Sequence, residues 1–200
     1  MLRVEALVTR AGRAPLSFDV ARGRCVGLLG TNAEDVSRVL LAAATLSRPV
    51  SGRVMIDDID TVREPDSVRR RVAVTRPRCV NDRLRLREYL DTVARARRST
   101  GTTLRASVAE TLQRLALDGA RTLTSPAARA EAALAASLMP SIDLVVLNEP
   151  FAHLSGDTRT RAIEWIRALA NEPVAVLIGG REERDLRAVS HTVIAMETAR

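Results

Sequence analysis

The sequence predicts an α/β fold with a parallel-sheet core, on three observations. Apolar segments of strand length alternate with helix-like segments along most of the 200 residues, which is typical of strands joined by crossover helices. The apolar run at 25–29 has no polar alternation and therefore suits a strand that is covered on both faces. Residues 82–136 break the alternation with successive helices, so we expect a helical insertion there.

The expected strands are short runs bounded by turn residues. The first residues alternate as a strand does, 16–20 alternates apolar with polar side chains, and 21–24 forms a turn before the buried run. Strands are expected at 2–8, 15–20, 24–29, 53–57, 72–75, 143–147, 173–178 and 192–196.

Helices are expected where apolar residues recur at helical spacing. The helix that follows the 25–29 run should begin with Asp35 as its N-cap. Its apolar stripe consists of Val36, Val39, Leu40, Ala43 and Ala44. Helices are expected at 35–46, 64–71, 84–98, 103–117, 127–138, 157–170 and 182–189. The whole chain, 1–200, is then one domain with a core of 1–81 and 137–200 and a helical subdomain at 82–136.

Composition indicates an ordinary globular domain with an unusual cation content. The chain is 46% hydrophobic, which is enough for a sizeable core. Its net charge of +7 is carried wholly by arginine, because the sequence contains no lysine. A basic chain can bind nucleic acid or an anionic membrane. Here the arginines are spread along the chain with few aromatic neighbours for base stacking, so no nucleic-acid partner is expected.

The compartment is predicted from what the sequence lacks. Cys25 and Cys79 are too few and too poorly matched for a disulfide framework or a metal cluster. No signal peptide and no apolar run of about 20 residues is recognisable. We therefore expect a cytoplasmic protein without direct membrane insertion, attached to a membrane only through another subunit.

The segment from Gly30 to Ser37 has the outline of a phosphate-binding loop. The pattern G-x-x-x-x-G-K-[ST] holds phosphates with backbone N–H groups, a helix N-terminus and a lysine. Val36 stands at the lysine position and Asp35 at the second glycine. The loop is therefore vestigial, with Gly30, Thr31, Asn32, Asp35 and Ser37 as its remaining positions, and we expect neither ATP nor Mg²⁺ to bind.

Asp35 has two compatible interpretations. As a helix cap it would simply stabilise the helix, and as a fixed anion it would occupy the field that a phosphate uses. A phosphate about 4 Å from this carboxylate would be repelled by roughly 1 to 4 kcal/mol per charge pair.

Five segments, taken in order along the chain, resemble the corresponding segments of the ATP-binding subunit of an ABC transporter. They are the entry 16–30, the strand and turn 51–58, the segment 68–72, the start of the helical part at 84–90, and the strand with its end at 142–150. The resemblance covers nearly the whole chain. It implies a P-loop NTPase-like parallel-sheet core with antiparallel N-terminal strands and a helical insertion.

The same resemblance implies that the catalytic positions have been lost. Val36 replaces the P-loop lysine, Asn148 the aspartate that supports Mg²⁺, and Arg181 the switch histidine. Further replacements are the missing aromatic near Ala11, Arg76-Pro77 at the Q-loop, Leu123 to Ala127 at the signature, and Ser155 at the D-loop. Glu149 alone remains, at the position that polarises the attacking water. Without its partners we interpret it as a strand-end or cap residue, so no catalytic or metal-binding residue is expected.

The resemblance implies a partner and a place for it. The family works as a dimer that drives a membrane permease, so we expect a permease subunit and an ABC ATPase-like subunit, in a hetero- or homodimer at the inner face of the membrane. The expected docking residues are Arg76, Arg78, Val80, Arg83, Leu84 and Tyr89. Solvated arginines on an ordinary loop are the alternative. The predicted function is an inactive structural or regulatory ABC subunit. A non-hydrolysing nucleotide switch and a basic nucleic-acid-associated regulator remain the alternatives.

Overall fold

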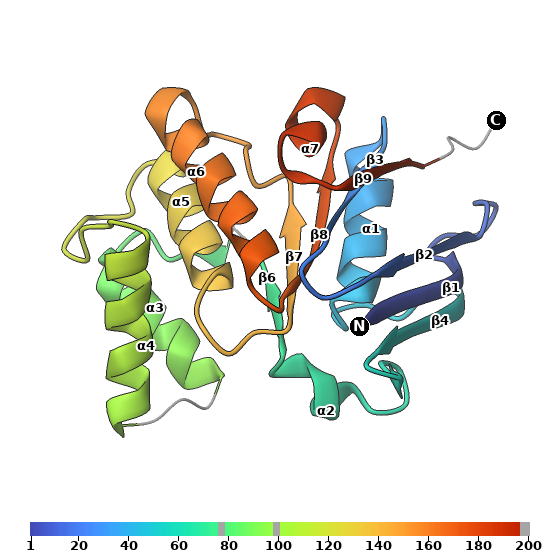
Figure 1. The fold of residues 1–200 in the computed structure, drawn as a ribbon, viewed down its shortest axis with the longest axis horizontal. Coiled ribbons are helices and arrows are strands. Elements are labelled where there is room, and N and C mark those ends of the chain that lie inside the picture. Colours follow the sequence, from blue (N-terminus) through green and yellow to red (C-terminus); the bar gives the residue numbers. More distant parts are fainter. Residues whose placement is uncertain (76–78, 98–100, 197–200) are drawn as a thin grey trace.

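Two β-sheets and the helices around them make up the protein (Figure 1). The computed structural model describes residues 1–75, 79–97 and 101–196. The predicted Arg76-Pro77 pair and Arg78 lie outside these ranges. The predicted α/β class, with a parallel core and antiparallel N-terminal strands, is confirmed.

The antiparallel sheet has the strand order β2-β1-β4-β5. Its strands are β1 (Leu2–Val8), β2 (Leu16–Val20), β4 (Ser51–Ile56) and β5 (Ile59–Asp60). Leu2 is paired with Val20 on one side and with Ile56 on the other. Burial alternates over residues 2–5 of β1, as the sequence predicts, and an irregularity after Val4 then shifts the register, so that Leu7 is buried as well. The two-residue strand β5 is too short to give a sequence signal and was not predicted.

The parallel sheet has the order β6-β7-β8-β3-β9. Its strands are β3 (Cys25–Leu29), β6 (Val72–Val74), β7 (Leu144–Asn148), β8 (Ala175–Gly180) and β9 (Thr192–Ala195). All its pairings are parallel, so the carboxyl ends of β3, β7 and β8 lie at one edge. This edge is where ligands bind in open α/β sheets.

The two faces of the parallel sheet are covered by different layers. Helix α1 (Ala33–Ala43) packs between one face and the antiparallel sheet (Figure 1). Leu144 and Val146 of β7 point to that side, whereas Val145 and Leu147 point to the cluster on the other face. This alternation follows from the period of two in a strand and explains why the run is continuously apolar.

The second layer contains the remaining long helices. The helical insertion consists of α3 (Leu86–Ala96), α4 (Gly101–Arg114) and α5 (Pro126–Ser137), which follow one another between β6 and β7. Helices α6 (Gly156–Ala168) and α7 (Glu183–Val189) belong to the core, α2 (Pro65–Arg69) precedes β6, and a short 3₁₀ turn, Leu169–Asn171, follows α6. Each predicted helix exists, with ends shifted by a few residues.

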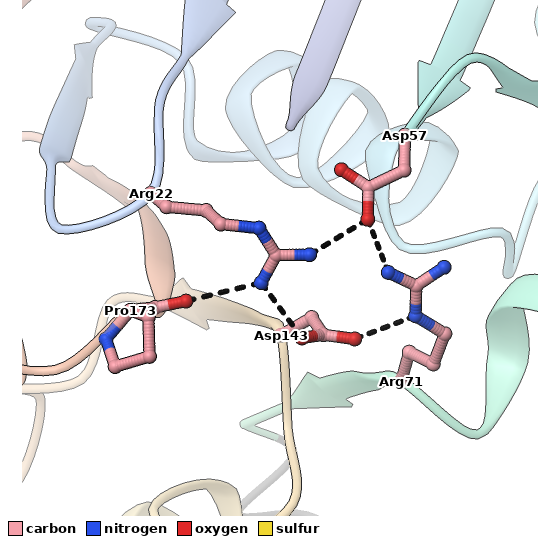
Figure 2. A network of polar contacts seen from close by, with 5 residues as sticks. All are labelled: Arg22, Asp57, Arg71, Asp143 and Pro173. Atoms are coloured by element: carbon pink, nitrogen blue, oxygen red, sulfur yellow. Dashed lines mark hydrogen bonds and ion pairs between the residues drawn. The ribbon is translucent and has the colours of Figure 1, made fainter.

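A ring of four charged residues ties the antiparallel sheet to the amino ends of the parallel strands (Figure 2). Arg22 Nη1 lies 2.8 Å from Asp143 Oδ1, and Arg22 Nη2 lies 2.7 Å from Asp57 Oδ2. Arg71 Nε donates to Asp143 Oδ2 at 2.5 Å and Arg71 Nη2 donates to Asp57. Arg22 also donates to the carbonyl of Pro173, at 3.1 Å. The ring lies at the end of the sheet opposite the phosphate loop.

This ring should make the folding stability of the chain decrease at acidic pH. Burial alone would raise the pKa of Asp57 and of Asp143, but the hydrogen bonds and charges of Arg22 and Arg71 outweigh it and lower both pKa values. A carboxylate with a lowered folded pKa stabilises the fold above its unfolded pKa of about 3.9, and this stabilisation is lost as the pH falls through the folded value.

We expect Asp143→Asn to lower the free energy of unfolding by about 1 to 2 kcal/mol at pH 7, since the ring is a partly exposed network. The difference from the unmodified chain should shrink below pH 4. Urea unfolding at pH 7 and pH 3 measures both effects. Asp82→Asn is the control, because Asp82 is exposed and forms no ion pair with the described residues. An equal loss at both pH values would contradict this account.

Candidate nucleotide site

The loop between β3 and α1 closes on itself. Asn32 is the N-cap of α1, and its side-chain oxygen accepts the N–H groups of Glu34 at 2.9 Å and Asp35 at 3.4 Å. The prediction that Asp35 caps the helix is therefore wrong. Asn32 begins the helix one turn earlier, and Asp35 lies inside its first turn. N–H groups that a phosphate would need are already bound by a side chain of the loop.

The charge of Asp35 is also neutralised within the chain. Arg13, from the connection between β1 and β2, donates its Nη2 to Asp35 Oδ2. Asp35 is buried, and Arg13 is mostly withdrawn from solvent. Glu34, which is exposed, pairs instead with Arg38 one helical turn away, at 2.6 Å. An internal ion pair thus spans the space between the antiparallel sheet and the phosphate loop.

The side chain of Val36 is buried in the core and does not extend into the space where a phosphate would bind. It is 1% exposed and belongs to the cluster between the two sheets. A β-carbon added at Gly30 would lie 2.5 Å from Val36 Cγ2, and one added at Gly179 would lie 2.5 Å from Val36 Cγ1. The two glycines therefore make room for the valine, and this position is part of the core.

Asn148, which replaces the aspartate that supports Mg²⁺ in the family, binds a residue of the vestigial phosphate loop. Asn148, at the end of β7, donates its Nδ2 to Ser37 Oγ at 2.7 Å. Asn148 Oδ1 is buried and has no hydrogen-bond partner among the described residues. In the ranges that the structure describes, no group of three or more His, Cys, Asp or Glu side chains is placed to hold a metal ion.

The remaining carboxylate of the site is paired as well. Glu149 follows β7 with a positive φ of 44°, and its backbone N–H donates to the carbonyl of Gly179 at 2.9 Å. Arg181 follows β8 and donates Nε to Glu149 Oε1 at 2.9 Å. The pair is partly exposed, so it is screened by solvent, but it holds a cation where a general base would need a water molecule.

The signature and D-loop positions are helix caps. Ser125 is the N-cap of α5 and its hydroxyl accepts the N–H of Ala128 at 3.1 Å, while Pro126 occupies the first helical position. Ser155 is the N-cap of α6 and forms a reciprocal cap with Thr158. Both segments therefore have a local structural role in the isolated chain.

Four of the predicted docking residues are described. Val80 is buried, Leu84 and Tyr89 are half-buried, and Arg83 is exposed. Burial raises the pKa of Tyr89. These residues lie at the start of the helical insertion, around the beginning of α3. Arg76 and Arg78, which were expected to complete the surface, lie outside the described ranges.

A cavity of about 330 Å³ remains beside the closed loop. Its lining includes Leu7, Pro15, Gly30, Asp35, Val39 and Met196. It lies between the antiparallel sheet and α1, and the pair of Arg13 with Asp35 forms part of its wall. The sequence analysis missed Arg13 and the capping role of Asn32. Asn32 could have been found, because asparagine is a preferred N-cap residue and acidic residues, here Glu34 and Asp35, favour the first turn of a helix.

The two sheets, the interposed helix α1 and the helical insertion define the ATP-binding cassette fold. The structure superposes on that of an ATP-binding subunit of an ABC transporter with a TM-score of 0.84, at 18% identity over 98% of this chain and 86% of the other. The dimeric structure of a bacterial ABC transporter cassette gives 0.85, at 16% identity over 98% and 94%. At these identities the comparison establishes the fold alone.

The sequence establishes the family. The ABC transporter family profile matches residues 14–152. The daunorubicin/doxorubicin resistance ATP-binding protein DrrA of Streptomyces peucetius is 31% identical over 82% of this chain and 51% of its own length. The resistance protein DrrA3 of Streptomyces coeruleorubidus is 32% identical over 82% and 53%. The chain belongs to the ABC transporter family, as an ATP-binding domain, and spans about half the length of these curated relatives.

One further property bears on membrane association. Within the described part of the chain, none of the helices combines the length and the apolar character that are needed to cross a membrane.

Proposed function

We propose that this chain is a catalytically inactive ABC ATPase-like subunit. The observation that carries the proposal is the internal pairing of the site: Arg13 with Asp35, Asn148 with Ser37, and Arg181 with Glu149. Each pair engages one residue at a position where the resemblance places the phosphate loop, the metal or the attacking water. The closed loop at Asn32 adds a fourth obstacle, because it engages the N–H groups of the helix N-terminus.

Phosphoryl transfer makes the consequence of these pairs severe. Catalysis of this reaction depends almost entirely on positioning and on stabilisation of charge by a lysine, a metal ion and oriented donors. The chain has no lysine, and Asn148 offers a neutral amide in place of a carboxylate ligand. Glu149 faces a guanidinium. Neither ATP nor Mg²⁺ is then a cofactor of this subunit.

The role that remains is structural or regulatory. We propose that the chain binds a membrane permease subunit and an ABC ATPase-like subunit, in a hetero- or homodimer, and is held at the inner face of the membrane by those partners. The docking surface proposed for the permease comprises Val80, Arg83, Leu84 and Tyr89, with Arg76 and Arg78. Relatives described as drug-resistance proteins make a transporter of that type the first complex to examine.

A second candidate function is a nucleotide-binding switch that does not hydrolyse. The cavity of about 330 Å³ beside Gly30 supports it, because this volume is within the range of small-molecule sites. A ligand there would have to bind without the phosphate contacts that Asn32 and Asp35 now occupy.

Titration of the purified chain with Mg-ATP distinguishes the inactive subunit from the nucleotide-binding switch. We expect the purified chain to show no binding heat and no rise in Tm with Mg-ATP at millimolar concentration, and no phosphate release above that of a heat-inactivated control. A rise in Tm without turnover would support the switch instead. Turnover would overturn both candidates. Affinity purification of the tagged chain from solubilised membranes tests the second half of the proposal, which fails if no membrane subunit is recovered.

A further inference from the structure

Arg97, directly after α3, carries a guanidinium that forms no ion pair with a carboxylate of the described residues. The residue is half-buried, and its Nη1 atom is buried without a hydrogen-bond partner among the described residues. No described Asp or Glu forms an ion pair with it, whereas Arg22 and Arg71 share two carboxylates. Burial lowers the pKa of Arg97. A cation withdrawn from water without a counter-charge costs free energy, and an incoming anion relieves that cost.

Arginine outnumbers acidic residues in the sequence around Arg97. In the sequence, the stretches 76–78 and 98–100, which lie outside the described ranges, contain three arginines, a proline, a serine and a threonine, and no acidic residue. Residues 76–136 as a whole hold 12 arginines against six Asp and Glu. Most of the net charge of +7 therefore lies in and just before the helical insertion. A partner whose contacting surface is acidic is attracted by the net positive charge of this whole region.

The surroundings of Arg97 combine this charge with apolar surface. Arg97 directly follows the helix that carries Tyr89, and Cys79 lies in the segment before that helix. Burial raises the pKa of Tyr89, the charge of Arg97 lowers it, and that of Cys79 raises it. Tyr89 is half-buried and packs against the core, while Cys79 is exposed. Helix α3 lies on the side of the molecule away from the antiparallel sheet (Figure 1). An aromatic ring beside a partly desolvated guanidinium suits a polypeptide that presents an apolar side chain and a carboxylate together.

We infer that Arg97 is the recognition residue of the docking surface and binds a carboxylate on an acidic, partly apolar segment of the membrane subunit. This inference rests on the proposed function, and it names the chemistry of the partner. A protein segment fits better than an anionic lipid surface, because Asp82, Glu88 and Asp91 lie in the same stretch and would repel a continuous layer of anionic headgroups. A single withdrawn guanidinium matches a single placed carboxylate.

The chain itself supplies a probe position for the test. Cys79 is exposed in the segment before α3, whereas Cys25 is buried and burial raises the pKa of its thiol to about 11. Benzophenone maleimide should therefore label Cys79 selectively. The labelled full-length chain is added to detergent-solubilised membranes of its source cells and irradiated, and the cross-linked peptides are sequenced by mass spectrometry.

We expect a cross-link into a membrane-subunit segment that contains Asp or Glu. Its yield should fall at least about tenfold with Arg97→Gln and remain unchanged with Arg105→Gln, a matched exposed arginine that forms no ion pair with the described residues. The isolated Arg97→Gln chain should unfold at the same Tm as the unmodified chain or a higher one, because an uncompensated charge is gone. Arg97→Lys, which keeps the charge but not the fork of donors, should give an intermediate yield.

Other outcomes overturn the inference in distinguishable ways. An unchanged yield with Arg97→Gln, or a cross-linked segment without an acidic residue, removes the role of Arg97. A fall in the Tm of the isolated Arg97→Gln chain assigns that residue a structural role instead. Arg97-dependent binding to phosphatidylglycerol vesicles makes the surface a lipid contact. If the tagged chain recovers a membrane subunit but Cys79 does not cross-link to it, the inference fails and the proposed function stands. If no membrane subunit is recovered, both fail.

Discussion

A Val36→Lys variant should gain neither Mg-ATP binding nor turnover, and it should lose at least about 3 kcal/mol of unfolding free energy. Val36 is 1% exposed, and its two methyl groups lie 2.5 Å from where β-carbons would be if Gly30 and Gly179 had side chains. An ammonium group placed there must be buried without a partner or must displace the helix. Asn32 and the ion pair of Asp35 with Arg13 would still occupy the helix N-terminus. Urea unfolding and calorimetric titration with Mg-ATP measure the two effects.

The same substitution at an exposed valine provides the control. Val50 is 64% exposed, so Val50→Lys should change the free energy of unfolding by no more than about 0.5 kcal/mol. If Val36→Lys binds Mg-ATP, the closed loop and the internal carboxylate are weaker obstacles than we infer from the contacts. If its stability equals that of Val50→Lys, the loop can rearrange at little cost and Val36 is not a core residue in solution.

A second large effect is expected at Glu131, a buried carboxylate of α5. Glu131 is 3% exposed and accepts hydrogen bonds from Arg121 and from Arg161, the latter at 2.8 Å. Arg161 belongs to α6, so this contact joins the helical insertion to the core. Glu131→Ala would leave two guanidinium groups without their shared carboxylate, and such a loss costs about 3 to 5 kcal/mol. The Tm should fall by roughly 6 °C or more.

Thermal unfolding followed by circular dichroism measures this effect. Glu164→Ala is the matched control, because Glu164 is an exposed residue of α6 and forms no ion pair with the described residues. It should unfold within a degree or two of the unmodified chain. A Glu131→Ala chain that is equally stable would mean that the buried network contributes little and that apolar packing alone holds the helical insertion.

The fold could be predicted because its signals are local. The run at 25–29, the alternation of β1 and the apolar stripe of α1 each follow from the period of a strand or a helix, so their existence and type were clear. Strand β5 has two residues and no periodicity, so it could not be found. The start of α1 was misplaced by one turn because Asn32 and Asp35 are both good caps, and the choice between them depends on which N–H groups the loop presents.

The site was predicted less completely than the fold. The resemblance identified the replaced positions, yet it did not indicate that they bind one another. The contact of Asn148 with Ser37 follows from parallel topology, which brings the ends of β3 and β7 to one edge, so it was within reach. The partner of Asp35 could not be predicted, because Arg13 is one of many arginines and no local sequence pattern distinguishes it from the others.

The ion pair between Arg13 and Asp35 links the β1–β2 connection to α1 without any ligand. A ligand lying between the β1–β2 connection and α1 would link them only while it is bound, and its concentration would set how often they are joined. Here an ion pair within the chain makes the link. If the chain binds no nucleotide, as we propose, this link is independent of the ratio of ATP to ADP. In the role proposed for it, this subunit therefore contributes an unchanging conformation to its complex, and ATP-dependent conformational changes of that complex have to arise in another subunit.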